Sequence, residues 1–181
     1  MNSIGFFCLG VIGWSLTEYI MHLFVGHEYG ASTPFGKVHR KHHAQKDYFE
    51  TRINKVKSAL KIGTPMAIIG ALVLGAESGL AFAVGFIGAY GFYEYLHYTL
   101  HVKAPTTFYG RWARRHHFYH HFEKPSFNHG VTSPLWDLVF GTYTNPGTVR
   151  VPRKFAMRWL INEEEAVWPN LVNDYSLKGR R

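Results

Sequence analysis

The chain is poor in cysteine and has two long segments without a basic residue. Its one cysteine, Cys8, lies in an apolar run, which excludes an internal disulfide and a CxxC zinc motif. Residues 1–36 and 62–102 contain no Lys or Arg, so all twenty basic residues fall in 37–61 and 103–181. Lys and Arg are costly in hydrocarbon, so a membrane protein needs such segments and a nucleic-acid-binding domain does not. The formal charge of +8 therefore indicates an asymmetric membrane protein with no nucleic-acid partner.

The segments without basic residues predict an all-α protein with about three membrane spans. Residues 1–26 suffice for one crossing of about 20 residues and lack the basic start of a signal peptide. Residues 62–93 are too long for one crossing, and Gly75–Gly79 predicts a turn between two helices. The second of these helices is expected to continue to about His101. By the positive-inside rule both basic regions face the cytoplasm. A monotopic protein with a buried hairpin is the alternative.

The chain from residue 145 onward is expected to be a peripheral tail of a single domain that covers residues 1–181. Asn145-Pro146-Gly147 predicts a turn. The segment Phe155–Leu160 mixes aromatic and basic residues. This mixture suits a membrane surface or, equally, an ordinary amphipathic helix packed on the domain.

The twelve histidines fall mainly into four spaced clusters. Their spacings are HxxxxH, HxxHH, HxxxH and HxxHH, formed by His22 and His27; His39, His42 and His43; His97 and His101; and His117, His120 and His121. Positions i, i+3 and i+4 share one helix face, so each HxxHH could point three imidazoles at one place, and HxxxH forms a chelating pair. His22 and His27 are about 140° apart on a regular helix. We therefore expect the helix end to fray near Gly26 so that both can reach one site.

Taken together, the four clusters predict a metal centre. An isolated HxxxH pair is more often local polarity, and one HxxHH can be a solvated face. Here, however, each cluster lies where an apolar segment meets a basic one, so ten imidazoles are expected at one membrane face. Ten imidazoles exceed one coordination sphere, which predicts two metal ions. A structural zinc site needs only four ligands, and a site with open positions for dioxygen favours iron. Zinc can replace iron in overexpressed protein.

This order of clusters, with the strings around it, resembles the fatty acid hydroxylase/sterol desaturase superfamily of membrane di-iron enzymes. The resemblance runs from Glu18 to Tyr143 and rests on Glu18–His22, Tyr93–Tyr98 and Arg115–Glu123. Gly130–Thr142 looks like the segment that follows the last histidine cluster in fatty acid 2-hydroxylases, the most similar branch. Carried over by position, the ligands of the two iron ions are His22, His27, His39, His42, His43, His97, His101, His117, His120 and His121.

The resemblance implies membrane helices beneath a cytosolic helical cap that holds the metals, in a bacterial inner membrane or the endoplasmic reticulum. It implies hydroxylation of a lipid, most simply a fatty acyl chain, with O2 and electrons from a separate donor of the cytochrome b5 or ferredoxin type. Three features depart from the family pattern. One apolar span precedes the first cluster where two are common, these residues include no fused cytochrome b5 domain, and His129 stands near a position that is commonly Gly.

Several residues near the clusters are candidates for orienting or extending the ligand set. A ligating imidazole usually donates its other N–H to a carboxylate or carbonyl. Glu94 precedes His97 by three residues and Glu18 precedes His22 by four, so each shares a helix face with its histidine. Asp137 and Glu123 are further candidates, although Asp137 could equally serve the first turn of a helix that begins at Ser133-Pro134. His116 and His129 are candidate extra ligands.

The four-cluster pattern is also compatible with other functions. A sterol desaturase or oxidase and a carotenoid ring hydroxylase share the four-cluster pattern. A membrane metal-binding or transport protein would place its ligands near mid-bilayer rather than at one face. A non-catalytic histidine-rich interaction surface would not need its imidazoles to converge.

Overall fold

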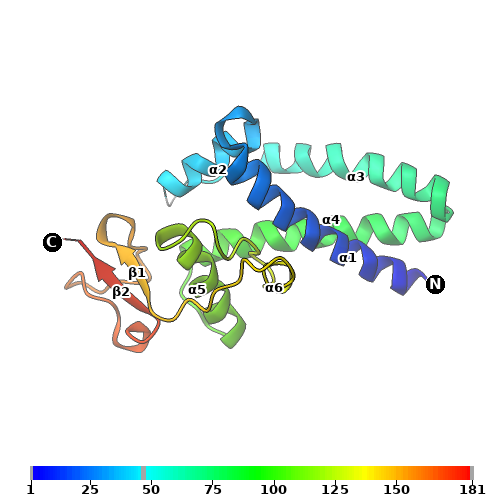
Figure 1. Ribbon diagram of the computed structural model, residues 1–181. Helices are drawn as coiled ribbons and strands as arrows, with labels where there is room; N and C mark the ends of the chain where they lie inside the picture. Colours follow the sequence, from blue (N-terminus) through cyan, green and yellow to red (C-terminus); the bar gives the residue numbers. More distant parts are fainter. Residues whose placement is uncertain (1, 46–47, 180–181) are drawn as a thin grey trace. The chain divides into compact units, whose positions relative to one another are not determined.

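The computed structural model describes residues 2–45 and 48–179. The helical elements are α1, Ser3–Ile20; η1, Met21–Glu28; α2, Pro34–Ala44; α3, Arg52–Leu74; α4, Ala76–Val102; α5, Phe108–Phe122; and α6, Leu135–Val139 (Figure 1). Short 3-10 turns lie at Gly30–Ser32, Arg153–Phe155 and Pro169–Leu171, and two strands lie at Val149–Pro152 (β1) and Tyr175–Lys178 (β2). The first residue of the expected amino-terminal span and the last two residues of the tail lie outside the described ranges.

The chain divides into two compact units. The first joins the chain up to Glu18 with Phe49–Tyr95, and the second joins Tyr19–Tyr48 with the chain from Leu96 onward. All twelve histidines belong to the second unit. The expectation of a single domain with a peripheral tail stays a prediction.

In the first unit, α3 and α4 form an antiparallel hairpin (Figure 1). The turn that the sequence predicts at Gly75–Gly79 is confirmed in place but is shorter, because α4 already begins at Ala76. Gly75 has φ +85°, a conformation that favours glycine. Trp14 of α1 packs on α4, with its ring centroid 5.4 Å from that of Phe86 and 4.8 Å from that of Tyr90.

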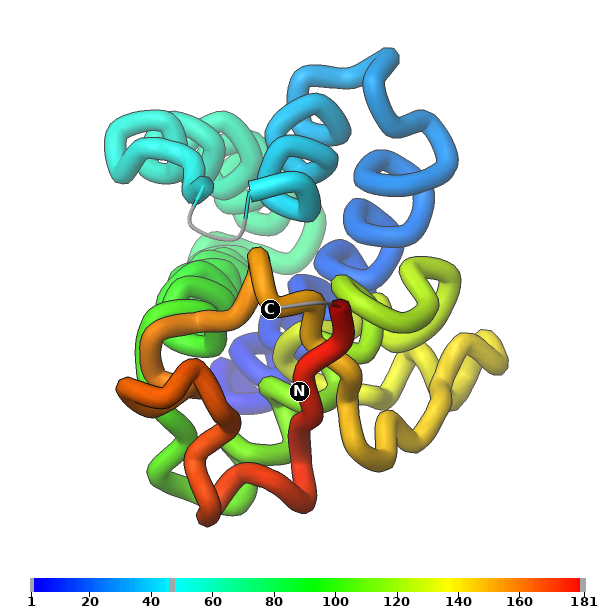
Figure 2. The backbone as a smooth tube through the Cα atoms, turned by 90° about the vertical axis from the view of Figure 1, so that its left-hand side faces the viewer, coloured from blue at the N-terminus to red at the C-terminus, as the bar shows by residue number. Residues whose placement is uncertain are grey.

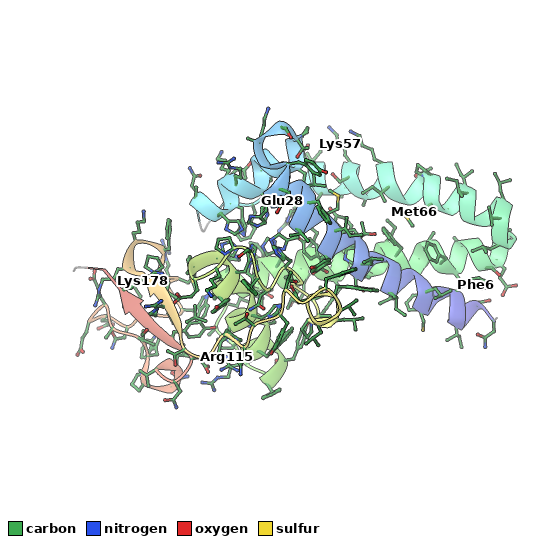
Figure 3. All side chains as sticks on the ribbon, in the orientation of Figure 1. Phe6, Glu28, Lys57, Met66, Arg115 and Lys178 are labelled. Carbon is green, nitrogen blue, oxygen red and sulfur yellow. The ribbon has the colours of Figure 1, made fainter. Side chains whose placement is uncertain are left out.

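Within residues 2–45 and 48–179, two helical stretches are long and apolar enough to cross a membrane, Ser3–Glu28 and Arg52–Leu74. Along α3 the apolar side chains of Ile68, Ile69, Leu72 and Val73 are exposed, Leu72 by 81%. In Figure 3 the side chains around Met66 of this helix are mostly carbon. An exposed apolar face of this kind suits contact with lipid rather than water. The helix α4 extends to Val102, as predicted, but its crossing of a membrane and the cytoplasmic orientation stay predictions.

The core of the second unit joins α5 to the carboxy-terminal tail. Phe118 is fully buried, and it packs with a cluster formed by Val149, Val151, Met157, Leu160, Leu171 and Tyr175. The strands β1 and β2 pair in parallel, with Val149 opposite Tyr175 and Val151 opposite Leu177. In Figure 2 the orange and red parts of the tube that carry these strands lie close together.

The tail corrects two sequence predictions. The fold is mostly helical, but the expectation of an all-α chain is wrong for Val149–Lys178, because β-branched Val149 and Val151 alternate with Arg150 and suit a strand. The segment Phe155–Leu160 is not an amphipathic helix, and its contact with a membrane surface stays a prediction. Its Met157 and Leu160 are 2% and 0% exposed, because they fill the core against α5.

Candidate metal centre

A first group of five imidazoles converges from three elements of the second unit. Its members are His22 and His27 from η1, His39 and His43 from α2, and His120 from α5. One ring nitrogen of each lies within 4.8 Å of those of the other four. The Nε2 atom of His27 lies 2.9 Å from Nε2 of His120 and 2.9 Å from Nε2 of His39. Figure 3 shows nitrogen atoms gathered in this region, between Glu28 and Arg115.

A second group of five imidazoles contains the other clustered histidines. Its members are His42 from α2, His97 and His101 from α4, and His117 and His121 from α5, again with one ring nitrogen each within a mutual 4.8 Å. The Nε2 atoms of His101 and His117 are 2.9 Å apart. The two groups adjoin each other, because the ring of His43 in the first stacks on that of His121 in the second, with centroids 4.0 Å apart. All ten predicted residues are thus brought together, and their role as ligands stays a prediction.

The two HxxHH clusters do not each point three imidazoles at one place, which corrects the sequence analysis. In α2, His39 and His43 enter the first group and His42 the second. In α5, His117 and His121 enter the second group and His120 the first. Residues i and i+4 are about 40° apart around a helix, whereas adjacent residues are about 100° apart. Each helix therefore gives an i, i+4 pair to one group and a single residue to the other.

The HxxxxH cluster is accommodated by a π-helix, so the prediction of a frayed helix end is wrong. The segment Met21–Glu28 is π-helical, and Tyr29 N–H donates to Phe24 O, five residues back, at 2.7 Å. In a π-helix the fifth residue comes round to nearly the same face, so His22 and His27 both reach the first group. Gly26 has a different use from the one expected. A Cβ there would lie 2.9 Å from the ring of His39, so glycine leaves room for that ring.

Backbone carbonyls orient three of the imidazoles from outside. The Nδ1–H of His22 donates to His129 O at 2.5 Å, that of His42 to Tyr48 O at 2.9 Å, and that of His120 to Phe127 O at 2.8 Å. Because a carbonyl can only accept, Nδ1 carries the proton in each case and Nε2 keeps a lone pair. This is the arrangement that metal-binding histidines use.

Five of the histidines of α2 and α5 are held neutral. Burial lowers the pKa of His39 and of His43 to about 2, and it also lowers the pKa of His117, His120 and His121. A neutral imidazole is the form that binds a metal.

The donor set fits metal ions. Within the described residues, Nε2 of His22, His43 and His121 is buried and has no hydrogen-bond partner. Each such atom costs about 1–3 kcal/mol unless something satisfies it. Two groups of five neutral imidazoles would satisfy these atoms by binding a metal ion each, and imidazole suits iron, zinc and copper.

The candidate carboxylates lie in different surroundings. Asp137 is fully buried and accepts from His129 N–H, Gly130 N–H and the Thr142 hydroxyl, each at 2.8 Å, and its Oδ2 lies 3.2 Å from His116 Nε2. Burial alone would raise the pKa of Asp137, but these hydrogen bonds outweigh it and lower the pKa. Asp137 therefore holds the loop whose carbonyl orients His22.

The other acids have different partners. The Oε2 atom of Glu94 lies 2.5 Å from Lys55 Nζ, and Glu123 pairs with Arg150 at 2.8 Å, which ties α5 to β1. Glu18 is buried. The suggested roles of Glu18 and Glu94 in orienting histidines stay predictions. Of the two candidate extra ligands, His116 faces Asp137, whereas His129 lies beside the first group, with its ring centroid 5.1 Å from that of His120.

Two residues that position the second group had no signal in the sequence. Arg114 is buried and donates to Thr99 O and Lys103 O at 2.9 Å, and to Gly110 O at 2.8 Å. It satisfies carbonyls at the carboxy-terminal end of α4, which a helix leaves without partners. Trp159 in the tail donates from Nε1 to His101 O at 2.8 Å. Both contacts depend on long-range packing that local spacing does not report.

The sequence of the chain is similar to those of known proteins. The sequence model described as fatty acid hydroxylase matches residues 7–142. The chain is 30% identical over 151 residues to the dihydroceramide fatty acyl 2-hydroxylase FAH1 of Arabidopsis thaliana, covering 81% of this chain and 62% of that protein. It is 32% identical over 148 residues to the fatty acid 2-hydroxylase of Homo sapiens, covering 77% of this chain and 40% of that protein.

A solved structure is also similar. It is described as full-length scs7p with only the hydroxylase domain visible, and it matches with a TM-score of 0.65 and 28% identity over 82% of this chain and 60% of that one. The chain thus spans about two-fifths to three-fifths of the length of the relatives named here.

Proposed function

Because this chain belongs to the fatty acid hydroxylase family, we propose that it hydroxylates an unactivated C–H bond of a fatty acyl chain in a membrane lipid. In this reaction one atom of O2 enters the C–H bond and the other leaves as water, with two electrons and two protons consumed. The observation that carries the proposal is the convergence of ten histidines into two adjoining groups of five. Such a donor set suits two redox-active metal ions better than one structural ion.

In this proposal the ten histidines hold two iron ions, which when bound supply the activation of O2. The residues around them do the rest. The carbonyls of His129, Tyr48 and Phe127 keep three rings in the tautomer that leaves Nε2 free to bind. Asp137 keeps the His129–Gly130 backbone in place, and Arg114 and Trp159 hold the end of α4 that carries His101.

The substrate and partners follow from the chemistry and the relatives. The two relatives are named as fatty acid and dihydroceramide fatty acyl 2-hydroxylases, which supports an acyl chain attacked near its carbonyl end. The apolar helices supply contact with the membrane that holds such a lipid. The basic regions at 37–61 and 103–181 favour a site on the cytoplasmic face. The electrons come from a donor of the cytochrome b5 or ferredoxin type that lies outside these 181 residues.

The test is production of the full chain in a host without lipid hydroxylation, grown under 18O2, followed by metal analysis and mass spectrometry of total lipids. The wild type is expected to bind about two metal ions per chain and to add one 18O atom to an acyl chain. The variant His39→Ala removes an imidazole from the first group and is expected to lose the product. Arg40→Ala, the exposed neighbour on the same helix, is the matched control and should keep both metal and product.

Other results would change the assignment. A lipid that loses two hydrogens instead of gaining oxygen would identify a desaturase, and a hydroxylated sterol or carotenoid would replace the acyl chain as the substrate. Bound metal with unchanged lipids would favour a membrane metal-binding protein. Unchanged lipids with no metal in either histidine group would refute the proposal.

A further inference from the structure

His129 is a fully buried histidine that the ten-ligand set leaves out. It lies in the loop between α5 and α6, and its backbone is held on both sides, by Asp137 at the N–H and by His22 at the carbonyl. The preceding residue, Asn128, has φ +59° and exchanges side-chain hydrogen bonds with the backbone of Thr144 at 2.8 and 3.0 Å. The ring of His129 therefore projects from a firmly anchored backbone.

The ring of His129 adjoins three members of the first group. Its centroid lies 5.1 Å from that of His120, 5.4 Å from that of His22 and 5.7 Å from that of His27. Distances between members of the group are similar, for example 5.3 Å between His22 and His27. The His129 ring also lies nearly perpendicular to the ring of Tyr19, with centroids 5.9 Å apart. The remaining histidine, His116, stacks on Trp112 and Tyr143 instead.

The packing around His129 needs an aromatic ring but does not need the two ring nitrogens. Both are buried, and neither makes a hydrogen bond of normal geometry within the described residues, although the Ser126 backbone interacts with the ring. A phenylalanine would fill the same space without the cost of about 1–3 kcal/mol for buried polar atoms left unsatisfied. His116 is equally buried, but its Nε2 is satisfied by Asp137.

We propose that His129 is a sixth imidazole donor to the metal of the first group, an inference that rests on the proposed metal site. The five inner members keep their ring nitrogens within 4.8 Å of one another, and His129 lies outside that set, on the side of His22, His27 and His120. It is therefore the outermost and most readily displaced donor. The two metal positions differ as a result, with six imidazoles available at the first and five at the second.

The experiment uses the full chain expressed with Co2+ and purified in detergent. The visible absorption of the cobalt and its release to a competing chelator are recorded, and His39→Ala and His97→Ala identify the signals of the two positions. The variant His129→Phe keeps the aromatic packing and the backbone contacts but removes both nitrogens. It should release cobalt from the first position about tenfold to a hundredfold more readily. Its absorption should strengthen as the coordination number falls, and the second position should be unchanged.

The variant Val131→Ala is the matched control, because it changes another buried residue of the same loop without removing a ring nitrogen, and it should behave as wild type. His129→Leu repeats the test if the phenylalanine variant does not fold. Unchanged release and absorption in both His129 variants would overturn the proposal. Equal weakening in Val131→Ala and His129→Phe would also overturn it, because the packing of the loop and not the ring nitrogen would then be responsible. Cobalt binding is read without turnover, so this result stands apart from the lipid analysis that tests the proposed function.

Discussion

At the scale of single residues, Asp137 links helix α6 to the first histidine group. The hydrogen bonds described above join it to the loop beside that group and not to an imidazole of the group. Its two oxygens collect hydrogen bonds from His129, Gly130, Thr142 and His116. The carbonyl of His129 then orients His22. A carboxylate is needed here because all of these groups point donors at it. The sequence offered helix capping as an equal alternative, and Asp137 does lie in the first turn of α6.

The substitution Asp137→Asn tests this link. The amide keeps one acceptor oxygen but turns an NH2 toward donors, so about 1.5–3 kcal/mol of stability should be lost. Metal affinity at the first group should fall about tenfold to a hundredfold, because His22 loses its orienting carbonyl. Chemical denaturation and metal competition measure the two effects. Thr142→Val removes only one of the donors and should cost less, about 0.5–1.5 kcal/mol. Unaltered metal affinity in Asp137→Asn would show that the loop does not position His22.

At the scale of elements, the π-helix η1 and the α-helix α2 form the first group by close approach. The wider turn brings His22 and His27 to one face, and Gly26 makes room for the ring of His39. Gly36 of α2 in turn packs directly against the backbone of Gly30 and Val25. Glycines therefore allow η1 and α2, two of the three elements that supply the first group, to pack closely against each other.

The substitution Gly26→Ala should displace His39, since the added Cβ would lie 2.9 Å from its Cδ2 atom. Metal affinity is expected to fall at the first group and to stay unchanged at the second, which receives no ligand from η1. Competition with a chelator measures both. Gly88→Ala in α4 is the matched control, because a Cβ there meets nothing within 4 Å, and it should be neutral or stabilising by about 0.5–1 kcal/mol. If metal affinity at the first group fell only in Gly88→Ala, or fell equally in Gly26→Ala and Gly88→Ala, the steric explanation for Gly26 would be wrong.

Local spacing was enough to predict the i, i+4 pairs of histidines that share a group, because this relation is a property of a single helix. It also placed the α3–α4 turn at Gly75 and carried α4 past His97. Local spacing could not predict that His39 and His43 enter one group and His42 the other, because this assignment depends on which neighbouring helix packs against each side of α2. The π-helix and the burial of Met157 and Leu160 against Phe118 were missed for the same reason.

At the scale of the whole molecule, the second unit encloses a dense set of neutral imidazoles. Its stability should therefore depend on both metal and pH. A metal that binds only the folded state adds to stability, and protons compete for the same lone pairs. In the metal-free protein, His39 and His43 have a pKa of about 2 when folded and about 6.5 when unfolded. Below pH 6.5 the unfolded chain thus binds protons that the folded protein does not.

The metal-free protein is consequently expected to lose stability as the pH falls below about 6.5. Each of these two histidines should contribute a loss of about 1.4 kcal/mol between pH 7.5 and pH 5.5. Equilibrium unfolding in detergent after chelation measures this slope. The double variant His39→Phe/His43→Phe removes both titrating groups. The free energy of unfolding that it loses between pH 7.5 and pH 5.5 should therefore be smaller than the wild-type loss by about 3 kcal/mol. A double variant that matches the wild-type slope would mean that these imidazoles are already protonated in the metal-free fold. The tight packing of their rings against His27 and His120 would then have to relax when the metal leaves.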